Sequence, residues 1–151
     1  MMMNTSMSSG LADTRLVIFH KQATSARLRF LRFEHGLFAL GAVDDAVELL
    51  EGEGAASLSS TVEWHPATLQ RMAEGYLGLE AGSLCMEPEF YGVVPTSRGV
   101  LRLRALALTA IDPPFEAAER IGGRFISITE ARGMSALERE ALRRVYEHVI
   151  G

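Results

Sequence analysis

The sequence predicts a single α+β domain with one mostly antiparallel β-sheet, or a mixed one, and two or three helices packed on one face. Short apolar segments with the two-residue period of strands recur along the chain, and two segments have the period of amphipathic helices. The length of 151 residues fits one domain. We expect residues 1–12 to form a flexible tail and residues 13–151 to form the domain, which ends in an amphipathic helix.

Composition and charge narrow the class of protein. The chain is 48% hydrophobic and 23% charged, which is typical of globular proteins. The net charge of −4 disfavours a general nucleic-acid binder, because such proteins carry a basic surface. The single cysteine, Cys85, excludes an intramolecular disulfide bond and a cysteine-rich metal site. The chain has no long apolar run and no secretion signal, so we expect a cytoplasmic protein that does not enter a membrane.

The first strands are predicted close to the N-terminus. Leu16–Phe19 is apolar at every position, which is typical of a central strand with both faces buried. A turn at 22–25 leads to a second predicted strand, Arg27–Phe33. The glycine-containing loop 34–36 then predicts a hairpin between this strand and Leu37–Leu40.

The middle of the chain is predicted to contain a helix with clear ends. Pro66 suits the first helical turn, and Gly78 suits the left-handed residue that follows the last turn. A shorter helix capped by Asp44 or Asp45 and a strand at 58–64 are expected before it. The apolar face of the longer helix comprises Leu69, Met72, Ala73 and Tyr76.

The stretch from residue 100 to residue 129 has the most regular pattern in the sequence. Val100–Ile111 is predicted to be a long strand, and Arg124–Thr129 another. Between them, Asp112 is expected to cap a short helix and Gly122 to end it. About a dozen residues separate the strands, which permits either a right-handed crossover between parallel strands or a helical turn between antiparallel ones.

A final helix and two short strands complete the predicted elements. Ser135 and Glu138 have the spacing of a capping box, which predicts the start of the last helix. Short strands at 84–86 and 90–94 are expected in the irregular segment that precedes the long strand. The apolar side of the last helix comprises Leu137, Ala141, Leu142, Val145 and Val149.

Four arginines form the first candidate site, for an anionic ligand. Arg27 and Arg29 share one face of the second predicted strand, and Arg102 and Arg104 share one face of the long strand. If the two strands were neighbours, the four guanidinium groups would converge, and their forked donors suit carboxylate or phosphate. The competing interpretation is a solvated sheet face on which these arginines pair with glutamates.

Glu63 and His65 form the second candidate site. On a strand they would point to the same side, so the carboxylate would orient the imidazole for acid–base chemistry or metal binding. His65 also precedes Pro66, so an equally simple interpretation is that it flanks or caps the helix.

The irregular segment Cys85–Tyr91 is the third candidate. Its thiol, the carboxylates of Glu87 and Glu89 and the phenol of Tyr91 are side chains that can line a pocket, and functional residues gather on loops. No basic residue adjoins Cys85 in the sequence to activate its thiol, so a buried structural cysteine is the favoured interpretation.

Motifs with a more specific mechanism are absent from the sequence. It has no glycine-rich phosphate loop, no His-Glu-x-x-His and no Gly-x-Ser-x-Gly. The four histidines lack the spacing of metal ligands. We therefore predict no catalytic residue, no metal and no cofactor.

The leading functional prediction is a non-enzymatic cytosolic accessory or binding protein that acts as a homodimer. The missing catalytic motifs favour it, as does a supply of apolar side chains beyond the needs of one small core. The alternative is a small enzyme or small-molecule-binding domain with an anionic ligand near Glu63, His65 and the Glu87–Tyr91 loop. The expected partners are a second copy of the chain, another protein or a small anionic molecule, and neither nucleic acid nor a membrane.

Overall fold

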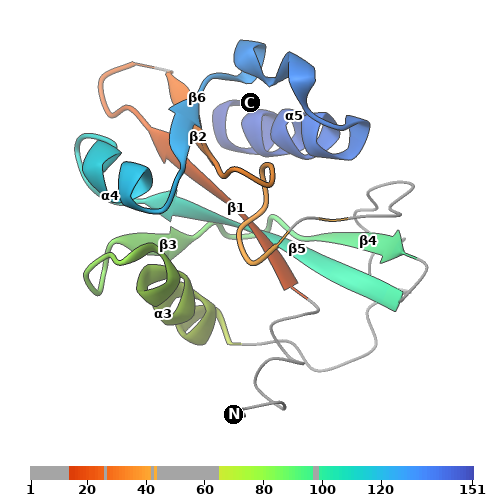
Figure 1. The fold of residues 1–151 in the computed structure, drawn as a ribbon, viewed down its shortest axis with the longest axis horizontal. Coiled ribbons are helices and arrows are strands. Elements are labelled where there is room, and N and C mark those ends of the chain that lie inside the picture. The colour runs from red at the N-terminus through yellow and green to blue at the C-terminus, as the bar shows by residue number, and fades with distance from the viewer. Residues whose placement is uncertain (1–13, 26, 42, 44–64, 97–98) are drawn as a thin grey trace.

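A mixed sheet of six strands and three α-helices make up the described part of the chain (Figure 1). The structure is a computed structural model that describes residues 14–25, 27–41, 43, 65–96 and 99–151. The strands are β1 (Thr14–Lys21), β2 (Leu28–Arg32), β3 (Leu84–Met86), β4 (Gly92–Thr96), β5 (Gly99–Leu108) and β6 (Arg124–Ile126). The helices are α3 (Pro66–Leu77), α4 (Phe115–Arg120) and α5 (Ala136–Ile150), with a 3-10 helix at Ile128–Gly133. The predicted α+β class is confirmed.

The apolar strand β1 lies in the interior of the sheet, as its sequence predicts. The strand order is β3-β5-β1-β2-β6, and β4 pairs with β5. β1 is parallel to β5 and antiparallel to β2. β3 and β4 are both antiparallel to β5 and pair with successive parts of it. Neighbouring strands pair both edges of β1 and helices cover both of its faces, which is why all four residues of Leu16–Phe19 are buried.

The connection from β5 to β6 is a crossover between strands that run in the same direction. β6 is antiparallel to β2, and β2 is antiparallel to β1, so β6 runs parallel to β5 with two strands between them. Helix α4 begins at Phe115 with Pro114 at its N-cap, so the predicted cap at Asp112 was wrong. A residue that precedes proline disfavours the helical conformation, and this keeps Pro113 out of the helix. The C-cap of α4 is Ile121, and Gly122 after it has the predicted left-handed conformation, with a φ of 76°.

The sheet has a helical layer on each face. The side chains of Leu16 and Ile18 pack with α3 and α4, and those of Val17 and Phe19 pack with α5. Figure 1 shows α5 and the pair of α3 and α4 on opposite sides of the strands. The expected helical layer on one face thus consists of α3 and α4, and α5 adds a second layer that the sequence pattern did not predict.

The segment after β2 does not form the predicted hairpin with it. Phe33 and Gly36 exchange backbone hydrogen bonds of 2.7 and 3.1 Å, but the pairing stops there. Ala39 instead exchanges hydrogen bonds with Leu16 of β1. Because Leu37, Phe38 and Ala39 are all buried, this segment fills the core rather than alternating between core and solvent. The predicted helix at 45–50 and strand at 58–64 lie outside the described residues.

Helix α3 covers the outer edge of β3 with two polar side chains. The Gln70 side-chain oxygen accepts a hydrogen bond of 2.8 Å from the Met86 amide. The buried carboxylate of Glu74 accepts bonds of 3.0 Å from the amides of Gly82 and Leu84. The predicted end of the helix at Gly78 is confirmed. The predicted apolar face was only partly right, because the buried residues are Leu69, Ala73, Glu74 and Leu77.

Helix α5 begins with the predicted capping box. The Ser135 hydroxyl accepts from the Glu138 amide, and the Glu138 carboxylate accepts from the Ser135 amide. The other oxygen of that carboxylate accepts a hydrogen bond of 2.9 Å from the amide of Leu37. Glu138 therefore both caps α5 and fixes the helix against the segment after β2. The core-facing residues of α5 are Ala141, Leu142 and Val145.

Candidate functional site

Three of the predicted site residues, Glu87, Tyr91 and Arg104, gather where β3 gives way to β4. Met86 pairs with Leu106 and Gly92 pairs with Leu103, so five edge residues (87–91) lie opposite two residues of β5 (104 and 105). β3 and β4 thus form one edge strand along β5, interrupted by a bulge of three extra residues. Glu89, inside the bulge, has a left-handed φ of 66°. Such a conformation persists only where neighbouring contacts hold it.

Arg104 and Tyr91, two of the predicted site residues, lie together on one side of this bulge. The Arg104 Nε donates a hydrogen bond of 3.1 Å to the carbonyl of Phe90. Its guanidinium carbon lies 5.5 Å from the centroid of the Tyr91 ring, in a cation–π contact. Arg104 therefore ties β5 to the bulge.

Helix α5 contacts the same bulge through His148. The His148 Nε2 lies 2.9 Å from the Pro88 carbonyl oxygen and 3.5 Å from a carboxylate oxygen of Glu87. Its ring meets that of Phe90 edge to face, with 5.7 Å between centroids. The predicted site residue Glu87 thus has a histidine partner that sequence spacing did not identify, because 60 residues separate His148 from Pro88. These contacts hold the bulge in place.

The two arginine pairs predicted to converge are not brought together. β1 lies between β2 and β5. Arg29 pairs with His20 at one end of β1, whereas Arg102 pairs with Thr14 at the other end. His20 and Thr14 are six positions apart along the strand, which corresponds to roughly 20 Å. Arg27 is exposed, in the turn before β2.

The remaining predicted residues have structural roles or lie outside the described residues. His65 is exposed, and its Nδ1 accepts a hydrogen bond of 3.1 Å from the Ala67 amide, so it is the N-cap of α3. Glu63 lies outside the described residues. The interpretation of Cys85 as buried was wrong: its thiol is exposed because β3 directs Leu84 and Met86, and not Cys85, into the core on α3.

A depression that the sequence analysis missed lies at the far end of β2. It has a volume of about 240 Å³ and is lined by Arg32, Phe33, Glu34, Gly122, Gly123 and Arg124. Arg32 of β2 and Arg124 of β6 are directly paired across the two strands. The paired residues of adjacent strands point to the same side, so the two guanidinium groups share the depression. Sequence spacing cannot reveal this pair, because 92 positions separate its members and the pairing of β2 with β6 is needed to join them.

The surface around α4 carries exposed apolar side chains. Ile111 is 80% exposed and Phe115 is 52% exposed. The Phe115 ring contacts Phe125 of β6 edge to face, with 5.6 Å between centroids. We call Ile111, Phe115 and Phe125 the α4 patch.

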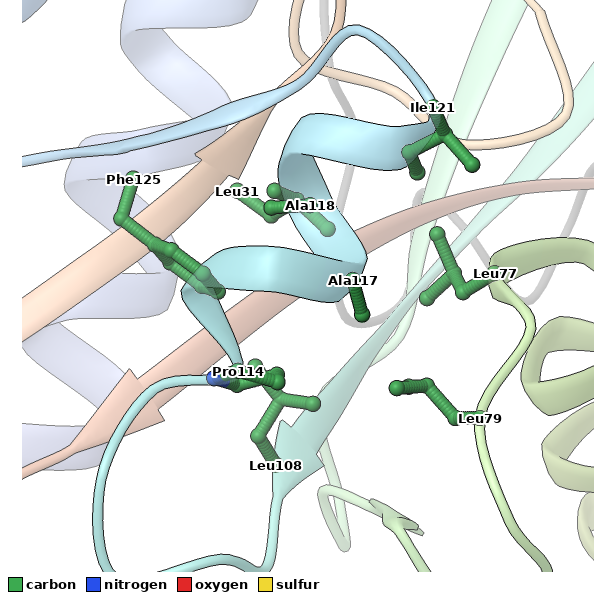
Figure 2. A pocket seen from close by; sticks show the side chains of 9 residues that line it. All are labelled: Leu31, Leu77, Leu79, Leu108, Pro114, Ala117, Ala118, Ile121 and Phe125. Atoms are coloured by element: carbon green, nitrogen blue, oxygen red, sulfur yellow. The ribbon is translucent and has the colours of Figure 1, made fainter.

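An apolar groove lies between α3 and α4, next to the α4 patch. Figure 2 shows Leu77 and Leu79 on one side of it and Ala117, Ala118 and Ile121 on the other. All nine residues that line the groove are apolar, and its volume is about 10 Å³. A space of this size accommodates about one water molecule.

Comparisons with known proteins do not identify a family for this chain. No family model matches the sequence, and no curated protein is significantly similar to it. In the described ranges, the metal-ligating side chains of histidine, cysteine, aspartate and glutamate do not gather in groups of three or more. None of the described helices has the length and apolar character needed to cross a membrane.

Proposed function

We propose that this chain is a non-enzymatic cytosolic binding protein that acts as a homodimer, and that the dimer forms through the α4 patch. The observation that carries the proposal is the exposure of Ile111 and Phe115. Exposed phenylalanine and isoleucine side chains remain in contact with water at a cost of about 25 cal/mol per Å² of apolar area. Covering them with protein recovers that free energy.

The form of the neighbouring groove favours a protein partner over a small ligand. Small-molecule sites are concave spaces of roughly 300–1,000 Å³. The groove between α3 and α4 has a volume of about 10 Å³ and cannot admit a ligand. The apolar side chains beside it are instead displayed on the outside, as in an interface between proteins.

The charges along α4 favour a second copy of the chain as the partner. The exposed residues of α4 are Phe115, Glu116, Glu119 and Arg120, whereas Ala117 and Ala118 are buried. Glu116 lies in the first turn and Arg120 in the last. When two copies meet about a two-fold axis with their α4 helices antiparallel, Glu116 of each copy faces Arg120 of the other. This arrangement is self-complementary through its two Glu116–Arg120 pairs, with the exposed Phe115 at the N-terminal end of each helix.

A charge-reversal pair tests this arrangement. Arg120→Glu alone places two carboxylates opposite each other at both ends of the interface, so we expect it to shift the protein to monomer in sedimentation equilibrium. The double variant E116R/R120E restores both attractive pairs with reversed polarity, so we expect the dimer to return. Arg139→Glu, on the exposed surface of α5, makes the same charge change away from α4 and leaves the dimer unchanged.

Three results would contradict the proposal. One is a wild-type chain that stays monomeric at high micromolar concentration. Another is a dimer that R120E does not weaken, which would place the interface elsewhere. The third is a double variant that remains monomeric while retaining its fold, which would exclude the antiparallel pairing of Glu116 with Arg120 between two α4 helices.

A further inference from the structure

We infer that the depression between β2, β6 and the end of α4 is a binding site for a small carboxylate that carries a hydroxyl group beside the carboxylate. This inference concerns a different surface from the α4 patch and does not depend on the proposed dimer. It is based on the paired arginines Arg32 and Arg124, on Glu34 and on the space between them.

Two features show that the arginine pair can receive an anion. Like charges directly opposite each other on neighbouring strands destabilise a sheet unless an opposite charge joins them. Within the described part of the chain, neither the Arg32 nor the Arg124 guanidinium makes a hydrogen bond or an ion pair. Outside the depression, Arg124 acts on Glu130 of the 3-10 helix, whose pKa is lowered first by hydrogen bonds from Ser127 and last by the charge of Arg124. The forked donors of both arginines are therefore available for a carboxylate.

Two of the residues that line the depression, Gly122 and Gly123, have no side chains. A Cβ atom on Gly122 would lie 3.2 Å from the carboxylate carbon of Glu34, and one on Gly123 would lie 3.0 Å from the Arg32 carbonyl oxygen. Gly122 also has a left-handed φ of 76°. The two glycines thus let the chain pass close to Glu34 and Arg32 while the depression stays open.

Glu34 determines which anion fits. The two arginines and the one glutamate carry charges of +2 and −1, a net charge of +1, which one monoanion neutralises. An ionised carboxylate accepts hydrogen bonds but cannot donate them, so Glu34 selects a ligand with a donor group near its own carboxylate. A hydroxyl group supplies this donor and adds no charge. The volume of about 240 Å³ is below that of sites for drug-sized ligands, so the ligand has only a few non-hydrogen atoms.

The experiment is a titration of the full chain with sodium glycolate and, separately, with sodium acetate, followed by the amide NMR signals of Gly122 and Gly123. We expect saturable shifts of these two signals, with glycolate binding roughly ten-fold more tightly than acetate because it donates a hydrogen bond to Glu34. Ionic strength is held constant with sodium chloride, because exposed charges respond to salt.

Two variants of exposed residues distinguish binding from a general effect on structure. Arg124→Ala is expected to weaken glycolate binding roughly ten-fold or more. Glu34→Gln is expected to tighten the binding of acetate, because it removes the negative charge of Glu34 that repels the acetate ion. Arg139→Ala is the matched control: it deletes an exposed arginine of α5, far from the depression in sequence, and should change neither titration.

The outcomes either support or overturn the inference. A shift that does not saturate at tens of millimolar glycolate overturns it, as does equal binding by the wild type and Arg124→Ala. Acetate binding as tight as glycolate overturns the choice of a hydroxy-carboxylate as ligand. Saturable glycolate binding that Arg124→Ala weakens supports the inference, and the same binding in a monomeric R120E protein would show that the site does not depend on the proposed dimer.

Discussion

Replacing Glu74 with alanine tests the contact that joins α3 to the edge of the sheet. Glu74 is 5% exposed, and one of its carboxylate oxygens accepts hydrogen bonds of 3.0 Å from the amides of Gly82 and Leu84. A hydrogen bond to a charged group contributes about 1.5–3 kcal/mol, so two such bonds contribute about 3–6 kcal/mol. Removing the carboxylate also removes its own burial penalty, which offsets part of that loss. We expect E74A to lower the free energy of unfolding by about 2–4 kcal/mol.

Urea unfolding followed by far-ultraviolet circular dichroism measures this change, with all variants at one protein concentration because the proposed dimer would add to stability. E74Q keeps an oxygen acceptor without the charge and should fall between the wild type and E74A. Glu80→Ala is the control, since Glu80 is exposed just after α3 and its loss should stay within about 0.5 kcal/mol. An E74A protein as stable as E80A would refute the role assigned to this carboxylate.

Three further substitutions have defined outcomes. Phe115→Ala removes about half of a phenylalanine surface from the proposed interface, which is about 100 Å² or about 2.5 kcal/mol per copy. With two copies in the dimer, sedimentation equilibrium should show a dimer weaker by about 5 kcal/mol. An unchanged dissociation constant would place Phe115 outside the contact. His20→Phe deletes the ring nitrogen that lies 2.9 and 3.1 Å from the carbonyl oxygens of Ala110 and Ile111. Thermal unfolding should show that the free energy of unfolding falls by about 1–3 kcal/mol. Lys21→Ala, at an exposed position, is the control and should not show this decrease. In α5, hydrogen bonds from Arg143 and, to a smaller extent, from Arg144 lower the pKa of Glu140 from 4.5 to about 2. The ion pairs therefore stabilise the fold above pH 4.5, and this contribution is lost as the pH falls toward 2. The stability difference between the wild type and Glu140→Gln should therefore be small, because these pairs are exposed, and should disappear by about pH 2; a difference that grows on acidification would contradict this.

Local sequence signals predicted the elements whose ends depend on neighbouring residues. Gly78 and Gly122 end their elements in left-handed conformations, and Ser135 with Glu138 starts α5. These signals act over a few residues, so the sequence alone reveals them. The prediction of a hairpin after β2 was wrong for the opposite reason. Its loop satisfied local rules, but pairing with Leu16 of β1 and burial of three consecutive apolar residues determined the outcome.

The candidate site was harder to predict because it depends on strand order. Sequence periodicity placed Arg29 and Arg102 each on one face of a strand, but it could not show that β1 lies between those strands. For the same reason it could not show that Arg32 pairs with Arg124. The segment Glu87–Tyr91 was recognised as unusual from its composition, whereas its contact with His148 required the position of α5. Long-range pairing is the information that a single sequence lacks.

Sedimentation equilibrium of the wild-type chain from low to high micromolar concentration tests the proposed dimer most directly. The chain has a mass of 16.5 kDa. We predict that the weight-average mass rises with concentration and levels off at twice this value. A mass that stays at 16.5 kDa over the whole range would contradict the dimer, and a mass that rises past twice the chain would contradict the closed two-fold contact between α4 helices.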